Sequence, residues 1–133
     1  MKLFPIIAIL FFAFAPVSEA ALMAGAAKVD ITDYDAGPVN DPLYVKALVL
    51  KNEATVLTII TVDAVAIGEI GRVGNDYLPT VRARLEKELG ITPGSVLVNA
   101  SHCHGVILRD IVAQTVQAVD DAMKRLVPVR IGV

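Results

Sequence analysis

Apolar residues recur with two different periods along the chain, and the changes of period separate predicted strands from predicted helices. Alternating or β-branched apolar runs predict strands at residues 27–31, 43–50, 55–62, 95–100 and 129–133. The second and third of these strands are separated by the four residues 51–54, a length that is typical of a hairpin. A long turn-rich loop over 32–42 precedes that hairpin.

Two further segments place apolar residues at helical spacing. The first spans 77–89, with Pro79 in its first turn and Gly90 as its C-terminal stop. The second spans 108–126 and ends before Pro128. Strands that alternate with helices form βαβ units, whose crossovers are right-handed and whose strands pair in parallel. The predicted class is therefore α/β, with a mixed, largely parallel sheet, an N-terminal hairpin and crossover helices.

Hydrophobic residues make up 55% of the 133 residues, and the excess over an ordinary soluble chain is local to the N-terminus. All four Phe lie in the first fourteen residues, within an uncharged run over 3–15 that follows Lys2. This run is shorter than a bilayer span and leads to Ser18-Glu19-Ala20, whose small residues suit signal peptidase. We therefore predict a signal peptide over 1–20, a domain over 21–133, and a secreted or periplasmic protein with no transmembrane segment after cleavage. The alternative is a short N-terminal anchor or core helix.

Composition narrows the class of function. Lys and Arg number 12 against 14 Asp and Glu, and aromatic residues make up only 5%. Without a basic surplus or stacking aromatics, a nucleic-acid partner is not expected. The single cysteine, Cys103, excludes an internal disulfide, and we expect it to be a small buried residue.

Candidate chemistry follows two of the predicted strands. Asp63 comes directly after the strand over 55–62, and His102, Cys103 and His104 follow the strand over 95–100. If these strands are parallel, their carboxyl ends meet at one edge of the sheet. On an extended segment His102 and His104 face one side, which suits a zinc ion, and Cys103 faces the other. Asp63 is a turn residue, a third ligand, a general base or a carboxylate that orients an imidazole.

Several stretches of the chain together resemble the N-terminal domain of the neutral/alkaline non-lysosomal ceramidase family. The last of them contains Ser101-His102-Cys103-His104-Gly105, where the family has threonines beside its two histidines. The stretches that carry the resemblance are residues 25–32, 41–50, 61–63, 79–85 and 96–105.

The resemblance implies a zinc-dependent amidase that hydrolyses the linear amide C–N bond of ceramide, or of a similar lipid-like amide. It makes His102 a zinc ligand and places His104 in the substrate pocket beside the metal. The predicted catalytic residues are therefore His104, from the resemblance, and Asp63, from its place at the strand end. The family's other zinc ligands, a histidine, a glutamate and a tyrosine, lie downstream of residue 133.

We therefore expect a partial domain whose sheet is incomplete at its C-terminus. It would bind Zn²⁺ weakly, would be inactive alone, and would self-associate through the unpaired strand over 129–133. The alternative function is that of a secreted non-catalytic protein, in which His102 and His104 hold a metal or another subunit.

Overall fold

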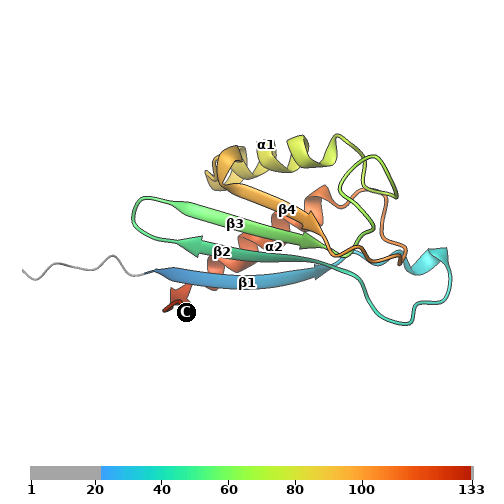
Figure 1. Ribbon diagram of the computed structural model, residues 1–133, viewed down its shortest axis with the longest axis horizontal. Helices are drawn as coiled ribbons and strands as arrows, with labels where there is room; N and C mark the ends of the chain where they lie inside the picture. Colours follow the sequence, from blue (N-terminus) through green and yellow to red (C-terminus); the bar gives the residue numbers. More distant parts are fainter. Residues whose placement is uncertain (1–21, 133) are drawn as a thin grey trace, which may run out of the picture.

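The computed structural model describes residues 22–132, so the predicted signal peptide over 1–20 lies outside the described residues. Five strands and two α-helices follow one another along this part of the chain (Figure 1). They are β1 (Met23–Asp30), β2 (Tyr44–Lys51), β3 (Val56–Val62), α1 (Tyr77–Leu89), β4 (Val96–Ala100), α2 (Val112–Lys124) and β5 (Val127–Pro128). Two short 3-10 turns, Tyr34–Ala36 and Pro93–Ser95, lie between them.

The strands form one mixed sheet in the order β4-β3-β2-β1-β5, which confirms the predicted α/β class and the β2–β3 hairpin. Parallel pairing joins β3 to β4, with α1 as the crossover between them. The other three strand pairs are antiparallel. The second predicted βαβ unit is therefore wrong, because α2 carries the chain from β4 to the opposite edge, where β5 runs antiparallel to β1.

Helix α1 has the bounds predicted from the sequence. Gly90 ends it in the left-handed conformation with φ 67°, and its backbone N–H donates to the carbonyl of Glu86. The buried side chains Tyr77, Val81 and Leu85 form the face that packs on the core.

Three predicted bounds need correction. Strand β1 begins at Met23 instead of residue 27. The prediction missed its start because the Ala- and Gly-rich residues there show no alternation of apolar and polar side chains. Helix α2 begins at Val112, since Leu108 donates its backbone N–H to the Ile31 carbonyl at 2.8 Å and is held in a loop. The strand predicted over 129–133 is instead Val127–Pro128, and it is paired with β1. Proline is tolerated there because β5 is an edge strand.

One face of the sheet carries the core. Every second side chain of β2 and β3 is buried on this face, and α2 lies across β1 and β2 behind the sheet (Figure 1). The approach of α2 to β1 is close, because a Cβ on Gly25 would lie 2.1 Å from the Ala122 carbonyl oxygen. The fully buried side chains of largest volume are Ile31, Ile60, Leu85, Ile91 and Ile111.

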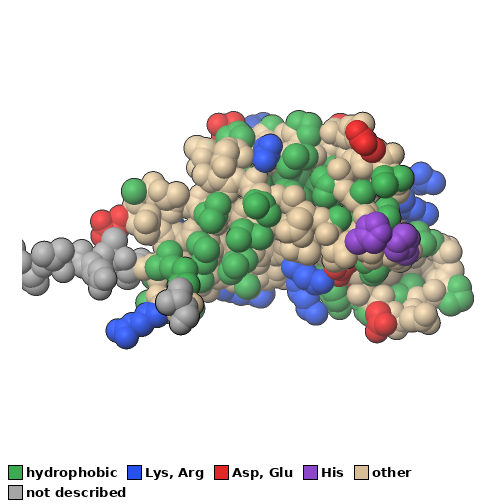
Figure 2. Space-filling model, in the orientation of Figure 1, with side chains coloured by type: hydrophobic (Ala, Val, Ile, Leu, Met, Phe, Trp, Pro, Cys, Tyr) green, Lys and Arg blue, Asp and Glu red, His purple; other side chains and the backbone are tan. Residues whose placement is uncertain are grey.

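The opposite face has no helix over it among residues 22–132. Strand register aligns Leu97, Ile59, Leu48 and Ala26 in a row across four strands. Leu97 is 50% exposed and Leu48 is 37% exposed. Figure 2 shows apolar side chains gathered over these strands, with the two histidines side by side beyond one end of the patch. We call this row the open apolar face.

Candidate functional site

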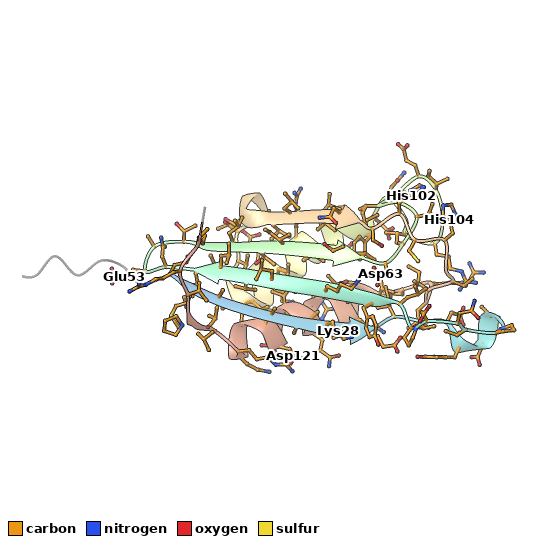
Figure 3. All side chains as sticks on the ribbon, turned by 60° about the horizontal axis from the view of Figure 1, so that its bottom comes forward. Lys28, Glu53, Asp63, His102, His104 and Asp121 are labelled. Carbon is orange, nitrogen blue, oxygen red and sulfur yellow. The ribbon has the colours of Figure 1, made fainter. Side chains whose placement is uncertain are left out.

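The chemistry-bearing residues of the sequence lie at one end of the sheet, as predicted from the parallel arrangement of β3 and β4. Val62 and Ala100 are paired at the carboxyl ends of these strands, and the chain leaves them as Asp63 and Ser101. Figure 3 shows Asp63, His102 and His104 at this end, with the β2–β3 turn at Glu53 at the opposite end of the molecule.

Asp63 is buried, and its carboxylate accepts three hydrogen bonds. Its Oδ1 accepts from Lys46 Nζ at 2.8 Å and from Ser101 Oγ at 3.0 Å, and its Oδ2 accepts from the Tyr44 backbone N–H at 3.0 Å. These donors belong to the start of β2 and to the loop after β4. The carboxylate therefore joins the hairpin to the loop that carries the histidines.

The protonation of Asp63 follows from these contacts. Burial by itself raises the pKa of the carboxyl, but the hydrogen bonds from Lys46, Tyr44 and Ser101 and the charge of Lys46 outweigh it and hold the pKa below its ordinary value. Asp63 is therefore an anion at neutral pH. Its contacts favour a role in holding the loop, because action as a general base requires Lys46 to move away first.

The loop of residues 101–104 is fixed through its backbone. Ser101 donates its N–H to the Val62 carbonyl at 2.9 Å, and Cys103 donates its N–H to the Ala64 carbonyl at 3.0 Å. Between these bonds His102 adopts φ 60°, a left-handed conformation that is uncommon for any residue except glycine. Such conformations persist where the surrounding structure imposes them, and they cluster at functional sites.

The two histidines lie together, but the segment that carries them is not extended as predicted, because His102 is left-handed. Their rings meet edge to face with centroids 4.9 Å apart, and the two Nε2 atoms are 3.3 Å apart. The Nδ1 atom of His102 lies 2.8 Å from the Val65 carbonyl oxygen. Asp63 is not hydrogen-bonded to either ring, and residues 22–132 contain no cluster of three or more His, Cys, Asp or Glu suited to a metal ion.

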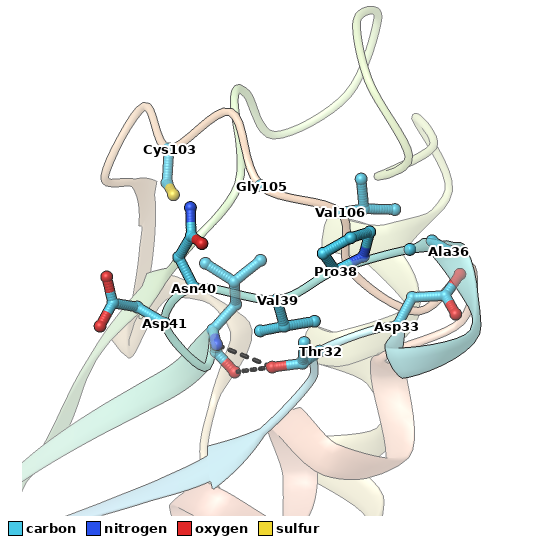
Figure 4. Close-up of a pocket in the computed structure, with 12 residues that line it drawn as sticks. Thr32, Asp33, Ala36, Pro38, Val39, Asn40, Asp41, Cys103, Gly105 and Val106 are labelled. Atoms are coloured by element: carbon cyan, nitrogen blue, oxygen red, sulfur yellow. Dashed lines mark hydrogen bonds between the residues drawn. The ribbon is translucent and has the colours of Figure 1, made fainter.

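A hollow of about 270 Å³ opens beside the histidine loop (Figure 4). The loop over 32–43 forms one wall, and Cys103, Gly105 and Val106 form the other. Cys103 is half-buried and lines this hollow. The hollow is small for a lipid, because sites that enclose drug-sized ligands typically measure about 300–1,000 Å³.

Two charged residues of this region, Lys46 and Arg72, were not predicted from the sequence. Lys46 was identifiable from the hairpin register, which places Tyr44 opposite Asp63 and Lys46 two residues further on the same face. Arg72 lies in the glycine-containing segment after β3. The sequence there has no periodic pattern from which its ion-pair partner could be predicted. It forms an ion pair with Asp33 and donates to the Ile107 carbonyl at 2.9 Å, and its hydrogen bond lowers the pKa of Asp33.

Among solved structures, this fold is found in neutral ceramidases. The neutral ceramidase from Pseudomonas aeruginosa matches with a TM-score of 0.67 and 20% identity, over 83% of this chain and 22% of that chain. A ceramidase complexed with C2 matches over the same shares with a TM-score of 0.67 and 19% identity. No known protein-family profile matches the sequence, and no curated protein matches it.

The resemblance to neutral ceramidases is therefore confirmed at the level of the fold. The chain spans about a fifth of the length of these structures. Within residues 22–132, neither helix has the length and hydropathy needed to cross a membrane.

Proposed function

We propose that this chain forms the histidine-bearing part of a ceramidase-like hydrolase domain that cleaves the amide bond of an N-acylated lipid. The observation that carries the proposal is the histidine loop itself. It follows the parallel strand pair of a fold shared with neutral ceramidases, and its backbone holds His102 in a strained conformation. The further proposal that the protein is exported rests on the leader over 1–20.

The donor set fits a zinc ion held by His102. A carbonyl oxygen can only accept, so the Val65 carbonyl keeps the proton of His102 on Nδ1 and leaves a lone pair on Nε2. A hydrogen bond of this kind orients histidine ligands in zinc sites. A bound zinc ion supplies a Lewis acid for the amide carbonyl and a water whose pKa is about 7.

The other residues of the site position these groups. Asp63 is expected to hold the loop through Ser101, so that the His102 ring keeps its orientation. The hollow beside Cys103 receives one part of the substrate; a smaller hollow of about 170 Å³, which shares Cys103, Gly105 and Val106 with it, is lined by His104. The second part of a lipid-sized substrate needs walls from outside residues 22–132, since the hollow is only about 270 Å³.

The chain alone is expected to be inactive. A catalytic zinc site typically has three protein ligands, and residues 22–132 bring together no such set. We therefore assign hydrolysis to the complete domain, of which this chain contributes the loop.

A chimeric enzyme tests the proposal. Residues 22–132 replace the structurally equivalent segment of the Pseudomonas aeruginosa neutral ceramidase, and hydrolysis of a fluorescent N-acylsphingosine is followed. We expect turnover by the chimera and none by its His102→Ala variant. The matched control is Glu53→Gln at the remote end of the sheet, which should hydrolyse as the parent chimera does.

A folded chimera that binds zinc without turnover would contradict the proposal. It would favour the second candidate function, that of a non-catalytic metal- or subunit-binding protein, for which the paired histidines suffice.

A further inference from the structure

We propose that the open apolar face binds a long-chain carboxylate. The hydrocarbon chain lies along the row of apolar side chains, and the anionic head lies at the cations beside Ala26 on β1. The inference goes beyond the proposed function and does not require it, because it concerns the flank of the sheet and not the histidine loop.

An open hollow of about 600 Å³ lies on this face, within the range of about 300–1,000 Å³ that is typical of ligand sites. Its apolar floor includes Ala26, Leu48 and Ile59, from three neighbouring strands. Leu97 extends the same row onto the fourth strand. Three interstrand spacings of about 4.8 Å give the row a length of about 14 Å. This length is close to half of a bilayer core of about 30 Å, and hence to one acyl chain.

The charged side chains that line the hollow are all cationic: Lys28, Lys46 and Arg125. Figure 2 shows basic side chains between the apolar patch and the two histidines. Lys28 and Lys46 are directly opposite each other on β1 and β2, and like charges in this position destabilise a sheet. Asp63 balances the charge of Lys46 at 2.8 Å. Lys28 and Arg125 form no ion pair within residues 22–132.

Lys28 has two other neighbours, and neither neutralises it. Its Nζ lies 3.9 Å from the centre of the Tyr44 ring, a cation–π contact that holds the ammonium at the polar end of the face. The Asp30 carboxylate is already hydrogen-bonded to the Thr32 backbone N–H at 2.8 Å and to the Tyr34 hydroxyl at 2.7 Å. The charge of Lys28 therefore remains available to a ligand.

These features together define the class of ligand. The apolar floor favours a hydrocarbon chain, and the cations at one end of it favour an anionic head. A neutral or cationic amphiphile would leave Lys28 and Arg125 without a counter-charge. A second copy of this chain would present the same cations on its own open face, so self-association there lacks charge complementarity.

Calorimetric titration of the purified protein with laurate, kept below its micelle concentration, tests the inference. We expect saturable one-to-one binding, and binding of hexanoate at least about tenfold weaker, because hexanoate has six fewer methylene groups. Lys28→Gln and Arg125→Gln should each weaken laurate binding by up to about fivefold, as expected for exposed charge pairs. The matched control is Lys87→Gln, which removes a cation from the last turn of α1 and should bind as the parent does.

The apolar floor is tested in the same way. Leu48→Ser should weaken laurate binding, because it removes an apolar contact from the middle of the row. Its matched control is Ile70→Ser, since Ile70 is 62% exposed in the loop after β3 and lies outside the hollow. Circular dichroism of each variant verifies that the fold is retained.

Several results would overturn the inference. They are the absence of saturable laurate binding, equal affinity of the parent and the Lys28→Gln/Arg125→Gln double variant, and equally tight binding of dodecyltrimethylammonium, a cation with the same chain. In sedimentation velocity without ligand, a dimer that dissociates in Leu48→Ser would show that a second copy covers the face. Binding to phosphatidylglycerol vesicles but not to free laurate would assign the face to a bilayer surface instead.

Discussion

Replacing Asp63 with alanine should destabilise the whole domain, because its carboxylate connects β2, β3 and the histidine loop. The largest contribution comes from the Tyr44 backbone N–H, which would lose its acceptor and remain partly buried without one, at a cost of about 1–3 kcal/mol. Lys46 is 46% exposed and returns to water, so its ion pair contributes only about 0.2–1 kcal/mol. Including the bond from Ser101, we expect the free energy of unfolding to fall by about 2–4 kcal/mol.

Urea unfolding followed by circular dichroism measures this change. Asp63→Asn should lose less stability than Asp63→Ala, because its amide oxygen can still accept from Tyr44. The control is Asp41→Ala, which removes an exposed carboxylate with no hydrogen bond among the described residues. A change below about 0.5 kcal/mol for Asp63→Ala, the range of ordinary surface substitutions, would refute the reasoning.

Protonation of the same carboxylate should lower the free energy of unfolding at acidic pH. The contacts of Asp63 hold its folded-state pKa below the ordinary value, so the stability that they contribute is present above that ordinary value and is lost as pH falls through the folded pKa. The parent protein should therefore lose stability below about pH 4. In Asp63→Asn the free energy of unfolding should fall less steeply over this acidic range. An unchanged slope would mean that other carboxyl groups cause the loss of stability.

Two further predictions concern the core. Gly25→Val should cost about 3 kcal/mol or more, because a Cβ there meets the fixed Ala122 carbonyl at 2.1 Å; a thermal melt within a few degrees of the parent would contradict this close approach. Tyr77→Phe should cost about 1 kcal/mol, since Thr115 keeps its bond to the Ile111 carbonyl when the tyrosine hydroxyl is lost. Burial raises the pKa of Tyr77 to about 12, so the part of a spectrophotometric titration that lies near this pH should be lost in Tyr77→Phe.

The sequence predicted elements whose bounds are set by local chemistry. Helix α1 was predicted to the residue, because an apolar stripe and the stop at Gly90 coincide. The hairpin was also predicted, since two β-branched runs flank a four-residue connection. The meeting of Asp63 with the histidine loop followed from the one correct βαβ unit.

The remaining features depend on tertiary contacts that periodicity does not encode. The place of β5 beside β1 is decided by the path of α2 over the sheet, and Pro128 was interpreted only as a helix stop. Leu108 continues a helical pattern but is held in a loop by Ile31. The left-handed conformation of His102 has no sequence signal, because glycine would be the expected residue there.

The open apolar face has a consequence for how folding of this protein is measured. Dyes that fluoresce on exposed apolar surface normally report partly folded states. Here Leu48 and Leu97 offer such a surface in the native state. A dye-based melting curve would start from a high signal, and the native protein would be read as partly unfolded. Unfolding of this chain therefore has to be followed by the circular dichroism of its backbone or by the signal of its buried tyrosine.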